Sequence, residues 1–144
     1  MKLDTVAHVD LNAIIEEHVR DLRPEIVYCV HPDINRDHQC LFDSALVAAR
    51  PLPGSPVRRL VTYAPLSSTE WDAGLSARPF APNLFVDIEK TLDVKIAAMN
   101  EFATELRDYP HPRSIEGIRV FAAREGSAVG VRFAEPFCIV RELA

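Results

Sequence analysis

One short polar segment carries the side chains of this sequence that are best suited to metal chemistry. It reads Asp-Ile-Asn-Arg-Asp-His over residues 33–38 and follows the apolar run at residues 26–30. Loops at the carboxyl ends of strands in open α/β sheets hold ligands and catalytic groups. Carboxylates, an amide and an imidazole in one such loop are suitable ligands for a divalent cation. The segment is therefore good material for a divalent-metal site, with His38 and Asp33 among the side chains that could contribute to it.

Each residue of this segment also has a structural interpretation. The segment precedes a stretch with helical periodicity, so Asp33 and Asp37 can cap a helix and interact with its dipole without any metal. His38 can be a polar group at the helix terminus. A single imidazole is not a metal site, and the remaining ligands must be sought elsewhere.

The segment is the first of several short motifs that follow one another along the chain. The others are Ala-Ala-Arg-Pro (48–51), Ser-Ser-Thr-Glu-Trp (67–71), Pro-Asn-Leu-Phe-Val-Asp-Ile (82–88), Pro-His-Pro-Arg-Ser (110–114) and Gly-Val-Arg-Phe-Ala-Glu-Pro-Phe (130–137). In this order they resemble the second half of the PIG-L/LmbE-like N-acetylglucosaminyl de-N-acetylases, over residues 3–143. The resemblance implies an α/β fold and a zinc-dependent amidase ancestry.

In that family, a His and an Asp of an N-terminal Ala-His-Pro-Asp-Asp-Glu motif bind zinc together with a later His. The first Asp of the motif is the general base. The resemblance places His38 at the later zinc ligand, and Asn35 where many members carry a second His. An Asn side chain donates a hydrogen bond but does not deliver a proton at neutral pH. Asn35 and Asp37 are the candidate catalytic residues.

The N-terminal motif itself is missing from this sequence. The segment at residues 7–12 begins with Ala-His but places Leu11 at the ligand position. His31-Pro32-Asp33 is followed by Ile34 at that position. The zinc ligand set is therefore incomplete, and we expect a truncated homologue that is inactive as an isolated chain. Two alternatives stay open: an active split hydrolase completed by a separate N-terminal partner, and a non-catalytic sugar-binding, metal-binding or interaction module.

Trp71 and Glu70 are candidate substrate-binding residues, because aromatic faces pack against the CH surfaces of sugars. They lie in a long polar segment between two expected strands, where Trp71 can equally anchor the loop.

Composition favours a single soluble domain over residues 1–144. The chain has 48% hydrophobic and 26% charged residues, as is usual for globular proteins. A net charge of −5 without a basic cluster argues against nucleic acid or an anionic membrane as a partner. The sequence has no run of 18 apolar residues and no signal-peptide pattern, so a cytoplasmic location is expected. The three cysteines are expected to be buried thiols.

Strand and helix signals alternate along the chain. Helices are expected at about residues 11–22, 37–50, 92–106 and 115–126, with strands at 26–30, 57–63, 84–88, 128–133 and 137–140. This alternation predicts an α/β fold that is partial Rossmann-like, a mostly parallel sheet with flanking helices on both faces.

A chain with half of such a sheet is expected to associate. Residues 26–30 are apolar throughout and should be buried on both sides, and the amphipathic helix before them needs a packing partner. We therefore expect a homo-oligomer, most simply a two-fold dimer. A symmetric partner could bring a second His38 or a His31 to the metal.

Overall fold

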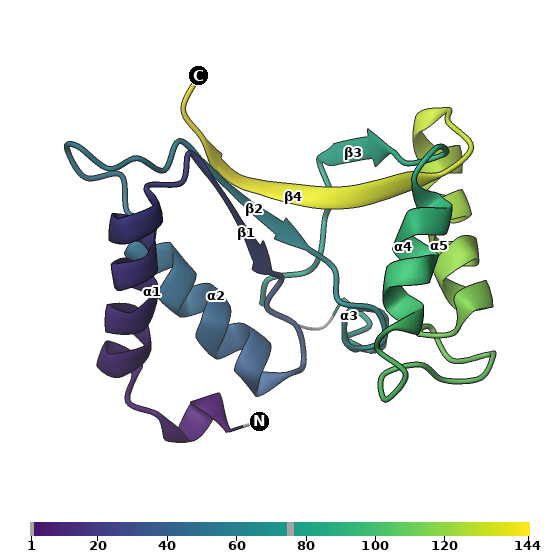
Figure 1. Ribbon diagram of the computed structural model, residues 1–144, viewed down its shortest axis with the longest axis horizontal. Helices are drawn as coiled ribbons and strands as arrows, with labels where there is room; N and C mark the ends of the chain where they lie inside the picture. The colour runs from purple at the N-terminus through teal and green to yellow at the C-terminus, as the bar shows by residue number, and fades with distance from the viewer. Residues whose placement is uncertain (1, 75–76) are drawn as a thin grey trace. The chain divides into compact units, whose positions relative to one another are not determined.

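Strand β1 (Ile26–Val30) forms where the sequence predicts it in the computed structural model, which describes residues 2–74 and 77–144 (Figure 1). It runs parallel to β2 (Arg59–Tyr63), with Ile26 opposite Arg59 and Val30 opposite Tyr63. Both strands belong to unit 1, which contains residues 1–81 and 138–144, whereas unit 2 contains residues 82–137. The single domain expected over residues 1–144 remains a prediction.

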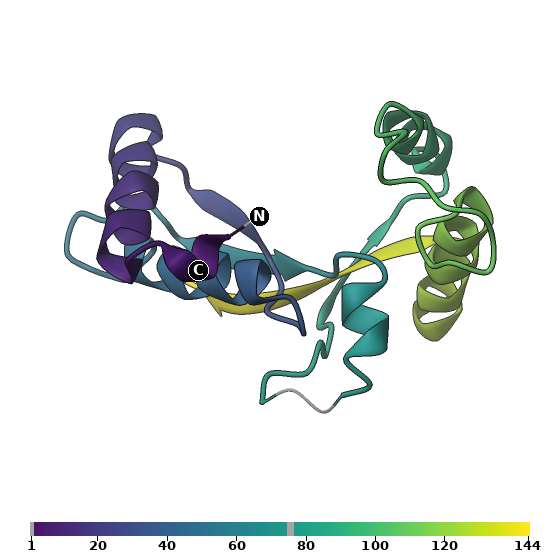
Figure 2. The ribbon, with the colours of Figure 1, turned by 90° about the horizontal axis from the view of Figure 1, so that it is seen from below.

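Two helices of unit 1 lie against each other (Figure 2), namely α1 (His8–Leu22) and α2 (Arg36–Ala48). A short 3-10 turn, η1 (Leu3–Thr5), precedes α1. Helix α1 ends at Arg23, whose φ of 46° is left-handed, just before Pro24. The core of unit 1 contains side chains from strands and helices. Its buried members are Cys29, Val30, Phe42, Ala45, Ala49, Val57 and Leu60. Burial also raises the pKa of the Cys29 thiol to about 11.

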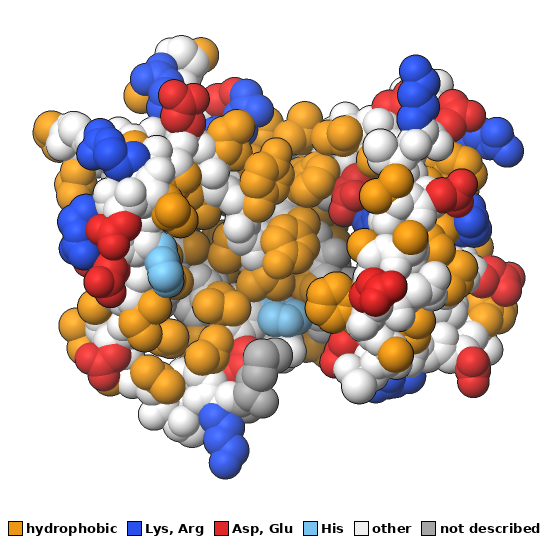
Figure 3. Space-filling model, in the orientation of Figure 1, with side chains coloured by type: hydrophobic (Ala, Val, Ile, Leu, Met, Phe, Trp, Pro, Cys, Tyr) orange, Lys and Arg blue, Asp and Glu red, His pale blue; other side chains and the backbone are white. Residues whose placement is uncertain are grey.

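The two faces of β1 differ, because side chains alternate along a strand. Cys29 is buried in the core, whereas Ile26 is 43% exposed and Tyr28 is 54% exposed. The expectation that this strand is buried on both sides is therefore wrong for the chain by itself. In Figure 3, hydrophobic side chains gather over β1 and β2. The exposed ones in the two strands are Ile26, Tyr28 and Tyr63.

Unit 2 contains β3 (Leu84–Asp87), α4 (Leu92–Asn100), α5 (Ile115–Val129) and the first residues of β4 (Ala134–Glu142). Ser114 caps α5, because its Oγ accepts the amide of Gly117 at 2.9 Å. The helix ends at Gly130 with a φ of 80°, not at Gly126. Gly126 lies inside the helix, where a Cβ would approach the carbonyl oxygen of Val131 to 2.7 Å.

The strand order of the sheet is β1-β2-β4-β3. An α/β fold with flanking helices, compatible with a partial Rossmann-like arrangement, is confirmed. The expected predominance of parallel pairing is wrong: β1 and β2 are the one parallel pair among the described strands, and β3 pairs with β4 antiparallel. Two successive helices, α4 and α5, separate β3 from β4 and bring the chain back along β3. No helix in the described part of the chain is long and apolar enough to cross a membrane.

Candidate functional site

The loop between β1 and α2 is shaped by two short side-chain contacts to the backbone. Asp33 Oδ1 accepts the amide of Asn35 at 2.8 Å. Asn35 then caps α2, because its own Oδ1 accepts the amide of Asp37 at 2.9 Å. Asn35 is therefore the N-cap of α2, and the capping hydrogen bond holds the Asn35 side chain beside His38. The distance from Asn35 Nδ2 to His38 Nε2 is 3.4 Å.

Asp33 is the centre of the site and is only 1% exposed. His38 Nδ1 lies 2.9 Å from both of its carboxylate oxygens. Ser68 Oγ donates to Asp33 Oδ2 at 2.7 Å, and Thr69 Oγ1 lies 3.4 Å from the same atom. A carboxylate that accepts the Nδ1–H of an imidazole fixes the ring and leaves Nε2 as the basic nitrogen. The geometry therefore leaves Nε2 as the basic nitrogen of His38 and gives Asp33 the role of holding the ring.

Asp37 is also buried but serves a different segment. Its Oδ1 accepts the amide of Leu3 at 2.7 Å, which ties η1 to the first turn of α2. A catalytic role for Asp37 or for Asn35 remains a prediction.

A helix that the sequence pattern did not predict brings the hydroxyl donors to Asp33. Helix α3 (Ser68–Trp71) is preceded by Ser67, whose φ is 83°, and starts with a capping box. The carboxylate of Glu70 accepts the amide of Ser67 at 2.5 Å. The Ser-x-x-Glu spacing at residues 67–70 is the sequence signature of this box and could have revealed the helix. Glu70 is thus committed to the helix start, and Trp71 is 58% exposed; their substrate-binding roles stay predictions.

His31 is buried and holds the segment that follows α3. Its Nε2 lies 3.0 Å from the carbonyl oxygen of Arg78, and its Nδ1 lies 3.1 Å from Thr62 Oγ1. Burial lowers the pKa of His31, and a neutral ring with a proton on Nε2 satisfies both contacts. With both nitrogens engaged, His31 is not placed to ligate a metal. His8 and His18 are exposed on α1.

The described residues contain no group of three or more His, Cys, Asp or Glu side chains that could hold a metal ion. A catalytic zinc needs three protein ligands. The residues that the structure describes therefore do not fit a complete zinc site: they provide one imidazole oriented by Asp33.

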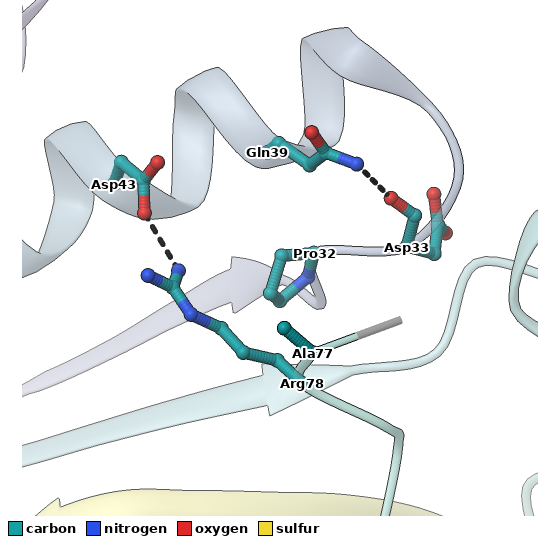
Figure 4. Close-up of a pocket in the computed structure, with 6 residues that line it drawn as sticks. All are labelled: Pro32, Asp33, Gln39, Asp43, Ala77 and Arg78. Atoms are coloured by element: carbon teal, nitrogen blue, oxygen red, sulfur yellow. Dashed lines mark hydrogen bonds and ion pairs between the residues drawn. The ribbon is translucent and has the colours of Figure 1, made fainter. Parts of the chain in front are cut away.

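A cavity of about 320 Å³ adjoins the site (Figure 4). It is lined by Pro32, Asp33, Gln39, Asp43, Ala77 and Arg78. Gln39 closes one wall, because its Nε2 donates to the Asp33 carbonyl oxygen at 2.5 Å. Arg78, Gln39, Ser68 and Thr69 were not singled out from the sequence.

No protein-family model and no curated protein sequence matches the chain. The chain does match several solved structures. The chain is similar to the conserved protein TT1542 from Thermus thermophilus, with 25% identity and a TM-score of 0.70 over 94% of this chain and 60% of that one. It is similar to the N,N'-diacetylchitobiose deacetylase from Pyrococcus horikoshii, crystallised with its inhibitor MPG, with 17% identity and a TM-score of 0.67 over 94% and 52%. It is also similar to GalB, the 4-carboxy-2-hydroxymuconate hydratase from Pseudomonas putida KT2440, with 19% identity and a TM-score of 0.68 over 96% and 61%.

These proteins share one fold with the chain. It is the PIG-L/LmbE-type fold of the deacetylase, so the resemblance read from the motifs holds at the level of the fold. The neighbours include a deacetylase and a hydratase, so the shared fold does not fix a reaction. The chain spans between 52% and 61% of the length of these three neighbours.

Proposed function

We propose that this chain carries the second half of a zinc-dependent amide-hydrolase site of the N-acetyl-sugar deacetylase type, and that it is inactive as an isolated chain. The observation that carries the proposal is the Asp33–His38 pair, in which a buried carboxylate holds Nδ1 and leaves Nε2 as the basic nitrogen. The Asn35 amide, which lies 3.4 Å from Nε2, would give way to a metal there. Metal-binding histidines are held by such partners, which fix the tautomer and raise the basicity of the ligating nitrogen.

His38, Asp33 and Asn35 would each have a different role at such a zinc site. When bound, zinc supplies a Lewis acid and lowers the pKa of a bound water. His38 would hold it, and Asp33 would keep the ring in place. The Asn35 amide, 3.4 Å from His38 Nε2, can donate a hydrogen bond to an oxyanion. The general base and two further ligands must come from outside the described residues, because these contain one oriented imidazole.

The position of β1 supports completion by an added strand. β1 is the last strand at its end of the sheet, and the loop with Asp33 and His38 follows its carboxyl end. A strand added parallel to β1 would end beside this loop, because parallel strands have their carboxyl ends on the same edge of the sheet. Such a strand could bring its own loop residues to His38. The added segment would be a separate chain or another part of a longer one.

Zinc retention and deacetylation together test the proposal. After dialysis against zinc, the chain should retain less than one equivalent by elemental analysis, and His38→Ala should lower that amount. The exposed His18 provides the matched control, since His18→Ala removes an imidazole from α1 without touching Asp33. Stoichiometric zinc held by the monomer would mean that the chain contains a complete ligand set, and would overturn the proposal of a half site.

The activity arm uses an N-acetylglucosamine-type substrate with zinc. The isolated chain should release no acetate above background, because loss of a positioned base alone reduces rates by about 10²–10⁴-fold. Turnover that disappears in His38→Ala would overturn the proposal of an inactive chain. Turnover that appears only after addition of a co-expressed N-terminal partner would support the split-hydrolase form.

A further inference from the structure

Arg78 is held in place at the cavity by contacts on three sides. Its carbonyl oxygen receives His31 Nε2 at 3.0 Å, which fixes the backbone. Its guanidinium carbon lies 5.3 Å from the centroid of the Phe42 ring, a cation–π contact with a buried side chain of α2. Its Nη1 donates to Asp43 Oδ1 at 2.7 Å. Two of these three contacts do not involve Asp43, and they do not depend on the ion pair.

Among the described residues that line the cavity, Asp43 is the carboxylate that competes for this guanidinium. In Figure 4 the Asp33 carboxylate points away from Arg78, and it is already engaged by His38 and Ser68. The Gln39 side chain binds the Asp33 carbonyl oxygen and the Arg36 guanidinium. Pro32 and Ala77 add apolar lining. The cavity therefore combines one cation with two carboxylates that already have partners and with a partly apolar wall.

We propose that this cavity binds a small organic acid whose carboxylate pairs with Arg78 in place of Asp43. The side chains of Arg78 and Asp43 are 53% and 44% exposed, and ion pairs this exposed contribute little to stability. An incoming carboxylate can use two parallel N–H donors of the guanidinium, whereas the contact to Asp43 uses Nη1. Asp43 is then an internal competitor that occupies the place of the ligand's carboxylate. The proposal does not depend on zinc or on hydrolysis.

The volume agrees with this class of ligand. A cavity of about 320 Å³ is at the lower end of the range of small-molecule sites, about 300–1,000 Å³, so it accommodates a short acid and not an extended chain. Amide-proton and Arg Nε–H chemical shifts of the ¹⁵N-labelled chain report occupancy directly. The probes are succinate, its neutral diamide and inorganic phosphate.

Succinate should shift the Arg78 Nε–H and the amides of residues 33, 39 and 43 in a saturable way, and the diamide should not. Asp43→Asn should tighten succinate binding by roughly 2–5-fold, because it removes the internal competitor at the cost of one exposed ion pair. Arg78→Gln should abolish the saturable shifts. Arg20→Gln, which removes an exposed arginine of α1, should leave succinate binding unchanged.

The direction of the Asp43 effect is the decisive result. Weaker or unchanged binding in Asp43→Asn would show that the pair is only a structural link between α2 and residue 78, and would overturn the proposal. Saturable shifts that persist in Arg78→Gln would do the same, as would tighter binding of phosphate than of succinate. If Arg78→Gln loses the dispersion of a folded chain, the Asp43→Asn titration still decides.

Discussion

Replacing Asp33 with asparagine separates the role of holding His38 from that of ligating a metal. The two side chains have the same shape, so the change removes charge and one acceptor while leaving the loop geometry possible. The introduced amide would still accept the backbone N–H of Asn35 through its one oxygen. Its NH₂ group would face Ser68 Oγ or His38 Nδ1, which donate to the carboxylate in the native chain.

The size of the effect follows from burial. A hydrogen bond to a charged group contributes about 1.5–3 kcal/mol to stability. In Asp33→Asn the Ser68 hydroxyl can rotate and accept a hydrogen bond from the new NH₂ group. The contact of His38 Nδ1, in contrast, loses its charged acceptor. With Asp33 1% exposed, we expect the free energy of unfolding to fall by roughly 2–3 kcal/mol. For a chain of this length that lowers Tm by roughly 6–10 °C.

Asp43→Asn is the matched control, because it makes the same chemical change on an exposed ion pair of α2. It should cost about 0–1 kcal/mol in urea unfolding at neutral pH. A loss in Asp33→Asn no larger than in Asp43→Asn would refute the reasoning. It would show that the Asp33 carboxylate is not needed to satisfy its neighbours and would return it to the set of candidate ligands.

Two further predictions concern pH and assembly. Burial lowers the pKa of His31 below its ordinary value of 6.5, so the stability that its neutral form contributes is complete above about pH 6.5 and is lost as the pH falls through the lowered pKa. The urea concentration at the unfolding midpoint should decrease as the pH is lowered through this range. The decrease should be smaller in His31→Gln and the same as in the native chain in His18→Gln. An equal decrease in all three chains would contradict this prediction. The chain should form dimers in light scattering at micromolar concentration, and Tyr28→Glu, on the exposed face of β1, should shift it toward monomer. A native chain that is monomeric throughout would remove the case for association through this face.

The local structure was predictable where one signal dominates. The apolar run at residues 26–30 is a strand with the expected bounds, and Ser114 caps a helix as its type suggests. The predicted end of this helix at Gly126 was wrong. A glycine inside a helix can allow close packing, and Gly126 packs against the backbone at residues 131–133. Gly130, four residues later, has the left-handed φ that ends the helix. A glycine at either position is compatible with a helix end, and the tertiary contacts of Gly126 decide between them.

Some residues that lie together at the candidate site could be predicted from the sequence, but their contacts could not. Asn35 and His38 were identified from the motif, and they lie side by side. Asp33 binds Ser68, 35 positions away along the chain, and Asp37 binds the backbone of Leu3, 34 positions away. Such contacts arise when tertiary structure brings α3 and η1 to the same loop, and no spacing within residues 33–38 encodes them.

Symmetry separates the question of assembly from that of catalysis. A two-fold axis that joins two copies through the open edge of β1 pairs the strands antiparallel. The five residues of β1 span about 16 Å, so the two loops that carry His38 would lie at opposite ends of the paired strands. Zinc–nitrogen bonds are about 2 Å long, and two His38 side chains so placed do not share one ion. His31, the other residue that a symmetric partner was expected to bring, is buried and engaged at both nitrogens. A dimer of this kind would cover the open edge of β1 and leave the ligand set incomplete. A different strand added parallel to β1 would cover the same edge and also deliver a second loop to His38. The geometry of β1 therefore predicts that zinc retention rises with a separate N-terminal partner but not with dimerisation.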